Sequence, residues 1–128
     1  MKLEVGQFAR LKSGYICKII NINDFREPNM KYGVEASYLK DVMFIGDDDV
    51  VKASYNIIDI LEKGDYVNGL RVEKNKYGEL YTSYVYYGGD IGKQCEVYTT
   101  WLKELEEDMI YSIVTHEQME QMAYKVGE

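Results

Sequence analysis

The sequence is poor in the residues that build catalytic centres and metal sites. Its 128 residues include one histidine, His116, and two cysteines, Cys17 and Cys95, which lie far apart in the chain. Two cysteines without CxxC spacing give neither a zinc site nor a disulfide framework. The sequence also contains no Walker loop, no GxGxxG motif and no HExxH motif. It therefore predicts no catalytic residue, no metal site and no cofactor, and it favours a binding protein over an enzyme.

Long apolar runs and flexible linkers are also missing. Residues 1–6 contain no apolar segment of the kind found in signal peptides, and the apolar stretches are far shorter than a membrane span. The chain has a single proline and no Ser/Gly-rich run. Cys17 lies among isoleucines, which is typical of a buried free thiol in a reducing compartment. We therefore expect a cytoplasmic protein that does not associate with membranes.

A surplus of basic charge is absent as well, because the net charge is −7. Residues 1–64 carry nine Lys/Arg against ten Asp/Glu, whereas residues 65–128 carry six against twelve. An acidic half repels phosphate backbones, so direct nucleic-acid binding is disfavoured and a basic partner surface is favoured. Solubility alone would also explain the excess of acidic residues.

The chain does contain a faint repeat. Residues 3–9 read LEVGQFA and residues 61–67 read LEKGDYV, so Leu, Glu and Gly recur in register and an aromatic residue follows each Gly. Both copies indicate a turn that leads into a half-buried strand. Ser13-Gly14 and Asn68-Gly69 predict tight hairpin turns. The expected strands are residues 8–12, 15–20, 42–45, 50–53 and 57–61 in the first copy and 66–67, 70–73, 80–87, 97–102 and 109–114 in the second, with a loop over 21–32.

The C-terminal pattern predicts one short helix. Thr115 and Gln118 have the spacing of a capping box, in which each side chain bonds the other's backbone N–H. A helix over residues 116–122 should follow, and residues 123–126 should return as a last strand. A short helical turn before the last strand is a feature of small SH3-like barrels.

We therefore predict a mainly β fold of two tandem SH3-like small barrels, with the short helix before the last strand. The first repeat spans residues 1–61, and the second, acidic repeat spans residues 62–128. A single larger barrel is the alternative. Barrels of about 60 residues are marginally stable alone, which leaves homodimer formation open.

Five stretches of the chain carry a family resemblance: EVGQF (4–8), INDFREPN (22–29), ASYNIIDIL (53–61), GDYVNG (64–69) and SIVTHEQM (112–119). The sequence resembles a family of small uncharacterised proteins encoded by phages and prophages of low-GC Gram-positive bacteria. Residues 81–107 depart from that pattern. Small acidic accessory proteins of such phages often inhibit host defence, and anti-CRISPR proteins are among them. The resemblance implies such a role by analogy of setting and not through any motif.

Tyrosine is the unusual feature of the composition, with 13 tyrosines against three phenylalanines and one tryptophan. Tyrosine gives a large contact area at low entropic cost, which is why recognition surfaces favour it. An acidic run follows Trp101, and an exposed aromatic residue beside carboxylates suits a basic groove. Packing of the β structure is the competing explanation for both. The predicted partner-binding residues are Tyr84, Tyr86, Tyr87, Trp101, Glu104, Glu106, Glu107 and Asp108.

Three further features are interpreted as structural. His116 should be an ordinary exposed surface residue, and residues 47–49 (DDD) should form a solvated turn, because adjacent carboxylates point apart. The glycine-rich residues 88–92 should form a loop tip.

The function that we expect is a phage-encoded, non-enzymatic binding protein that acts in the bacterial host cell. It would inhibit a host defence protein, such as a CRISPR nuclease, by occupying its basic, nucleic-acid-binding surface. One alternative is a nucleic-acid-binding phage accessory module that uses Lys74, Lys76 and Lys93. Another is a small-ligand sponge for a nucleotide signal.

Overall fold

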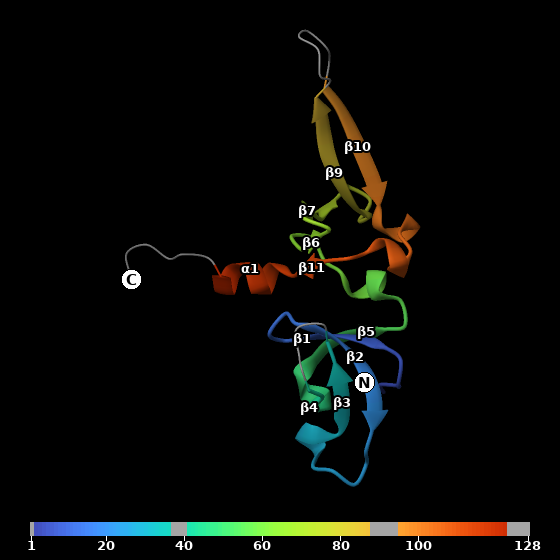
Figure 1. The fold of residues 1–128 in the computed structure, drawn as a ribbon, viewed down its shortest axis with the longest axis vertical. Helices are drawn as coiled ribbons and strands as arrows, with labels where there is room; N and C mark the ends of the chain where they lie inside the picture. Colours follow the sequence, from blue (N-terminus) through green and yellow to red (C-terminus); the bar gives the residue numbers. More distant parts are fainter. Residues whose placement is uncertain (1, 37–40, 88–94, 123–128) are drawn as a thin grey trace, which may run out of the picture. The chain divides into compact units, whose positions relative to one another are not determined.

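The computed structural model describes residues 2–36, 41–87 and 95–122. They form three antiparallel sheets, several 3₁₀ helices and one short α-helix near the C-terminus (Figure 1). The chain divides into two compact units, Met1–Ile60 (unit 1) and Leu61–Glu128 (unit 2). Over the described residues, no helix is both long and apolar enough to cross a membrane. The predicted mainly β class and the short helix are confirmed.

Unit 1 is one five-stranded sheet in which the last strand returns to the first. β1 pairs with β2 on one side and with β5 on the other, and β3 and β4 continue the sheet beyond β2. The Ser13-Gly14 turn joins β1 to β2 as predicted, and Gly14 has a φ of 91°. In sheet order the strands are β4 (Met43–Ile45), β3 (Tyr32–Glu35), β2 (Ile16–Ile22), β1 (Phe8–Leu11) and β5 (Val50–Ser54).

The core of unit 1 lies on one face of this sheet. Alternation along β2 turns Cys17 and Ile19 inward, and Ala9 lies opposite Cys17 on β1. Burial raises the pKa of the Cys17 thiol to about 11, and the predicted buried free thiol is confirmed. Arg10 is buried too, and its Nη1 donates to the Ile60 carbonyl at 3.1 Å. The core residues are Leu3, Ala9, Leu11, Cys17, Ile19, Tyr32, Val34, Ile45 and Val50.

β3 is the strand that the sequence pattern did not predict. The expected loop over residues 21–32 is shorter, because β2 continues to Ile22 and a 3₁₀ helix forms at Pro28–Met30. β3 then lies inside the sheet between β4 and β2, and its Val34 is completely buried. A Cβ at Gly33 would lie 2.6 Å from Oδ1 of Asn21 on the bulged β2, so a larger residue here would require the Asn21 side chain to move.

The expected strand over residues 57–61 is wrong. Ile57–Ile60 form a 3₁₀ helix instead. Asn56 Oδ1 accepts a hydrogen bond from the Ile58 N–H at 3.1 Å, and the Ser54 hydroxyl donates to Asp59 at 2.7 Å. These local bonds replace ladder bonds, and the helical turn buries Ile58 and Ile60.

Unit 2 contains two three-stranded sheets. The first has the order β11 (Ile113–Val114), β6 (Tyr66–Val67), β7 (Leu70–Arg71), and the second has the order β10 (Cys95–Trp101), β9 (Leu80–Tyr87), β8 (Glu73–Lys74). The Asn68-Gly69 turn between β6 and β7 has φ angles of 52° and 81°, as the sequence predicted for a tight hairpin. The expected strand over 109–114 is shorter, because Glu107–Met109 form a 3₁₀ helix.

The two units share one strand order. Only Val72, which is fully buried, separates β7 from β8. If β7 and β8 are taken as one interrupted strand, unit 2 repeats the order of unit 1, with the last strand beside the first. All three sheets are open over the residues that the structure describes, so the predicted barrel closure is absent there.

The two copies of the repeat, named here the first turn (residues 3–9) and the second turn (residues 61–67), have the same backbone form. Gly6 and Gly64 have φ angles of 95° and 92°, in the left-handed region that favours glycine. Leu3 and Leu61 are both buried before the turn.

The helix α1 (His116–Met122) begins and ends as predicted. Thr115 N–H donates to Gln118 Oε1 at 2.8 Å, and Gln118 N–H donates to Thr115 Oγ1 at 3.3 Å, which is the expected capping box. The strand predicted over residues 123–126 and the loop predicted over residues 88–92 lie outside the described residues.

Candidate functional site

The strongest candidate for a binding surface is the hairpin of β9 and β10, which run side by side as a long ribbon (Figure 1). At its base the hairpin is part of unit 2: Thr82 is buried, and the rings of Tyr81 and Trp101 meet edge to face at 5.5 Å. β8 pairs with β9 only opposite Tyr81 and Leu80. The half of the hairpin beyond these residues is a two-stranded ribbon in the described structure.

This outer half exposes apolar side chains on both faces. On one face the rings of Tyr84 and Tyr98 stack across the strands, with centroids 5.2 Å apart and planes 19° apart. On the other face lies the pair Val85 and Val97. Exposed fractions are 47% for Tyr84, 44% for Tyr98, 46% for Val85 and 64% for Val97. An isolated hairpin is marginally stable, and the aromatic pair supplies the cross-strand contact that holds it together.

The sequence pattern predicted Tyr84 but not Tyr98. Tyr98 lies 14 positions along the chain, and only the β9–β10 register, which places it directly opposite Tyr84, makes the two rings one surface. Tyr86 and Tyr87 lie at the end of β9, and their side chains are not among those described. The Trp101 side chain is half-buried, and its ring contacts that of Tyr81 at the base of the hairpin.

Three of the four predicted acidic residues lie on two short 3₁₀ turns after β10, and Glu106 directly precedes the second turn. Leu102–Glu104 form the first turn, and the buried Leu102 fixes it to the unit. Glu107–Met109 form the second. The side chains of Glu104, Glu106, Glu107 and Asp108 are all exposed.

A neighbouring lysine does not neutralise this acidic segment. Lys103 Nζ lies 2.9 Å from Glu79 Oε2. Hydrogen bonding with Lys103 holds the pKa of Glu79 below its ordinary value, and the same bond raises the pKa of Lys103. Lys103 is thus engaged by a fifth carboxylate, and the segment keeps a strongly negative potential.

The far end of the acidic segment is fastened by Asn68. Its Oδ1 accepts hydrogen bonds from the Tyr111 N–H at 2.9 Å and the Ser112 N–H at 3.2 Å, and its Nδ2 donates to the Met109 carbonyl at 2.9 Å. The sequence identified Asn68 only as a turn former. Its side chain also positions the residues that follow the two acidic turns.

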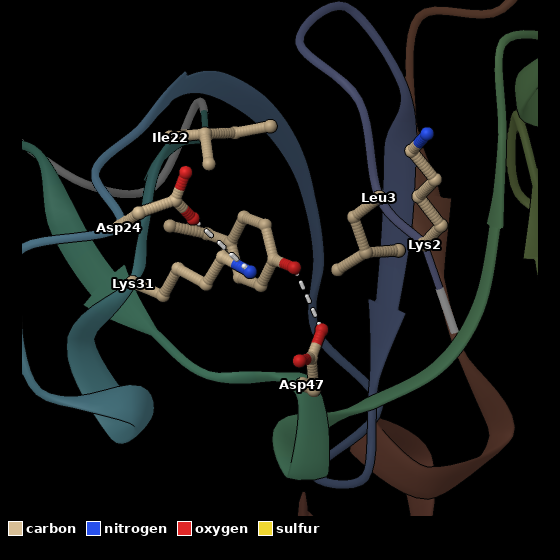
Figure 2. Close-up of a pocket in the computed structure, with 7 residues that line it drawn as sticks. Lys2, Leu3, Ile22, Asp24, Lys31 and Asp47 are labelled. Atoms are coloured by element: carbon tan, nitrogen blue, oxygen red, sulfur yellow. Dashed lines mark hydrogen bonds and ion pairs between the residues drawn. The ribbon is translucent and has the colours of Figure 1, made fainter.

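A second feature that the sequence did not reveal is a pocket of about 590 Å³ in unit 1 (Figure 2). Its polar groups are largely paired with one another. Lys31 Nζ lies 3.3 Å from Asp24 Oδ1, and the Tyr32 hydroxyl donates to Asp47 at 2.7 Å. The hydrogen bond with Asp24 raises the pKa of Lys31, while burial first and Asp47 second raise the pKa of Tyr32. The lining residues are Lys2, Leu3, Ile22, Asp24, Lys31, Tyr32 and Asp47.

The three aspartates at 47–49 form an exposed 3₁₀ turn, as expected. Asp47 accepts the tyrosine hydrogen bond, and Asp49 accepts from the Gly46 N–H at 2.9 Å. These carboxylates cap and anchor the turn instead of converging on one point.

His116 is not the exposed surface residue that the sequence predicted. Its side chain is half-buried at the start of α1, and a Cβ added to Gly64 would lie 3.3 Å from the Cβ of His116. Nε2 lies 2.9 Å from Glu62 Oε1 and 2.6 Å from Glu117 Oε1. The carboxylate of Asp65 is fully buried and accepts hydrogen bonds from the His116 N–H at 3.0 Å and the Glu62 N–H at 2.7 Å. The second turn therefore holds the start of α1.

Unit 2 therefore carries exposed tyrosines on its hairpin and exposed carboxylates after it, and these residues form the candidate surface. Comparison with known protein families, with curated proteins and with solved structures finds no match for this chain. The resemblance to small phage proteins therefore stays a prediction.

Proposed function

We propose that this chain is a non-enzymatic binding protein that uses unit 2 to cover a basic surface of a host defence protein. The observation that carries the proposal is the exposed stack of Tyr84 on Tyr98, on a hairpin whose other face is also apolar and exposed. Exposed apolar surface of this kind on a soluble domain favours contact with a partner. Stacked tyrosines lose little side-chain entropy when they bind, which makes them effective anchors.

The partner surface is proposed to be basic because of the two acidic turns. Four exposed carboxylates follow the base of the same hairpin, and unit 2 carries most of the net negative charge. Such a segment steers a positively charged surface toward the tyrosines and raises the association rate at low salt. Surfaces that hold nucleic acid are the common source of such charge. A CRISPR nuclease is the kind of partner that the predicted phage origin favours, within the host cytoplasm.

The unpaired edges of the hairpin offer a second mode of contact. Over the described residues, β10 has β9 as its one neighbour, and the outer part of β9 has β10. An edge strand can accept an added strand from a partner. Backbone pairing along β10 would place a partner against the tyrosine face.

We also propose that each unit is an open variant of an SH3-like fold. The shared strand order, with the last strand beside the first and a short helical segment near it, supports this assignment. Hairpins between strands of small barrels are common places for partner contacts, because loops and their extensions tolerate insertion without loss of the core.

The experiment is an affinity capture from a lysate of a host that carries defence systems, with bound proteins and nucleic acids both identified. We expect one nucleic-acid-binding defence protein that elutes as salt rises. Its affinity for purified wild-type protein is then compared with that of the double variant Tyr84→Ser/Tyr98→Thr, for which we expect a loss of about 30-fold or more. The control is Tyr111→Ser, which changes an 82% exposed tyrosine outside the hairpin.

A series of charge variants tests whether the acidic turns attract a basic partner surface. Neutralising Glu104, Glu106, Glu107 and Asp108 together should slow association about 10-fold or more at low salt and have little effect at high salt. The matched control neutralises four exposed carboxylates of unit 1, Glu27, Glu35, Asp41 and Asp48, and makes the same change in net charge. Equal losses in both quadruple variants would show that only net charge matters and would contradict the proposed surface.

A small-ligand function is the second candidate, and the pocket of unit 1 favours it. Thermal unfolding with a panel of nucleotides tests this candidate, since a ligand at 100 times its dissociation constant adds about 2.7 kcal/mol to stability. Loss of the shift in Lys31→Met would place the ligand in the pocket shown in Figure 2.

A further inference from the structure

The cluster of His116, Glu62 and Glu117 in unit 2 does not belong to the hairpin surface. Its three ligand atoms, His116 Nε2 and one oxygen from each carboxylate, all lie within 4.8 Å of one another. The residues come from two separate segments, because Glu62 belongs to the second turn and the other two begin α1. No local sequence pattern indicates this cluster, because 54 positions separate Glu62 from His116.

One nitrogen atom faces two carboxylate oxygens in this cluster. Nε2 lies 2.9 Å from Glu62 and 2.6 Å from Glu117. Nε2 carries at most one proton for these two oxygens, whichever tautomer the ring adopts. A cation at the point where the three atoms converge would interact with all of them at once.

The chemistry of the three ligand atoms suits a first-row divalent metal ion. Imidazole nitrogen and carboxylate oxygen are ligands of Zn²⁺ and of the neighbouring transition metals. Ligand atoms on a tetrahedral zinc ion lie roughly 3.4 Å apart at bond lengths of about 2.1 Å. The two carboxylates would therefore move outward by about 1 Å or less to admit the ion.

The backbone beneath the cluster is already fixed. The buried Asp65 carboxylate bonds the N–H groups of both His116 and Glu62, so the two segments are held together whatever the ligand side chains do. The side chains of His116, Glu62 and Glu117 are 35%, 27% and 22% exposed. An ion could therefore enter from solvent and keep a water molecule as its fourth ligand.

The first turn shows what the same motif looks like without these ligands. At the position of His116 stands Tyr55, whose ring would contact a Cβ at Gly6 and whose hydroxyl bonds Glu4. The residue after Tyr55 is Asn56, where unit 2 has Glu117. At these two positions, unit 2 has a residue that can supply a metal ligand where unit 1 has Tyr55 and Asn56.

We propose that Glu62, His116 and Glu117 bind one divalent transition-metal ion, which ties the start of α1 to the second turn. This inference does not depend on the proposed binding function. It assigns a metal site to a chain whose sequence predicted none.

The test is titration of the full-length, metal-stripped protein with Zn²⁺ by calorimetry, in the presence of a non-chelating reductant. We expect one ion per chain with a dissociation constant in the micromolar range or below. Glu117→Gln should weaken binding at least 10-fold, whereas Glu120→Gln, an exposed glutamate on the same helix, should leave it unchanged. Because both variants keep His116 and Asp65, neither should fail to fold.

Co²⁺ serves as an independent probe of the same site. Bound Co²⁺ should give visible absorption from nitrogen and oxygen ligands, which Glu117→Gln should shift and His116→Gln should abolish. No heat and no absorption at millimolar metal would overturn the proposal. Equal affinity in Glu117→Gln and Glu120→Gln would also overturn it, because the ion would then bind elsewhere, for example at a thiol.

Discussion

The first and second turns have the same local structure, but their side chains make different contacts with the rest of their units. In each, the residue after glycine sends a side-chain oxygen back to a backbone N–H: Glu4 N–H donates to Gln7 Oε1 at 2.8 Å, and Glu62 N–H donates to Asp65 Oδ2 at 2.7 Å. The backbone bond is repeated as well, from Gln7 N–H to the Glu4 carbonyl at 3.2 Å and from Asp65 N–H to the Glu62 carbonyl at 3.1 Å.

The two turns differ in the further contacts of the Gln7 and Asp65 side chains. The Gln7 bond is exposed and local. Asp65 is fully buried, and its second oxygen accepts the His116 N–H from a segment 51 positions away. The buried Asp65 carboxylate accepts hydrogen bonds from two backbone N–H groups, and so it joins the second turn to the start of α1. Among the described residues, the first turn makes no corresponding bond through Gln7.

The largest expected difference in stability is between the variants that remove the Asp65 and Gln7 side chains. Asp65→Ala should lower the free energy of unfolding of unit 2 by about 2–4 kcal/mol, because two backbone N–H groups lose a charged acceptor. Gln7→Ala should cost unit 1 at most about 1 kcal/mol. Urea unfolding measures both: fluorescence of Trp101 reports on unit 2, and labelling of the buried Cys17 thiol reports on unit 1. Equal losses in the two variants would show that Asp65 stabilises unit 2 no more than Gln7 stabilises unit 1.

The next effect is the pH dependence that Cys17 gives to the stability of unit 1. The pKa of Cys17 is about 11 in the folded unit, against an ordinary value of 9.0. Between these values the unfolded chain releases a proton that the folded unit keeps, so the stability of unit 1 should fall as pH rises from about 9 to 11. The full loss is about 2–3 kcal/mol relative to Cys17→Ala, in which this contribution is absent. Hydrogen exchange of β2 amides measures it in both proteins, and a parallel pH response in the two would contradict the assignment.

The two glycines test the turn backbone itself. Gly6→Ala and Gly64→Ala should each destabilise their unit by about 1 kcal/mol, because an L side chain is strained at these φ angles. Gly64→Ala should cost somewhat more, since its Cβ would lie 3.3 Å from His116 Cβ, whereas the Cβ at Gly6 would lie 3.5 Å from the Tyr55 ring. Urea midpoints with the same two probes measure the difference. A larger cost at Gly6 would show that His116 yields more easily than Tyr55.

The smallest effect should come from making the first turn resemble the second. Gln7→Asp keeps a side-chain oxygen near the Glu4 N–H. The new carboxylate would not, however, make a second bond like the one that Asp65 makes with the His116 N–H in unit 2. We expect a change within about 0.5 kcal/mol in the stability of unit 1, measured by Cys17 labelling in urea. A large gain would show that the carboxylate alone, and not its burial, makes the second turn strong.

Local features of the fold were predictable because local rules specify them. The hairpin turns at Ser13-Gly14 and Asn68-Gly69 depend on residues that tolerate positive φ. The start of α1 depends on the reciprocal bonds of Thr115 and Gln118, which lie three positions apart. The alternation around Cys17 indicated its burial. None of these requires knowledge of a distant segment.

The candidate site was predictable only in part. The acidic residues and Tyr84 stand out in composition, and both are exposed. Trp101 was indistinguishable from an exposed anchor until Tyr81 was seen against its ring. Tyr98 completes the aromatic surface only through the register of β9 and β10, which no short-range signal specifies.

Local sequence patterns specify the mainly β class, the tight turns and the short helix, and composition shows the excess of acidic residues in unit 2. Long-range packing specifies the helical turn at residues 57–60, the position of β3 between β4 and β2, and the contact of Glu62 with His116. Distance along the chain explains this division. Capping bonds and turn conformations are settled within four or five residues, whereas burial and convergence of side chains depend on which distant segments pack together.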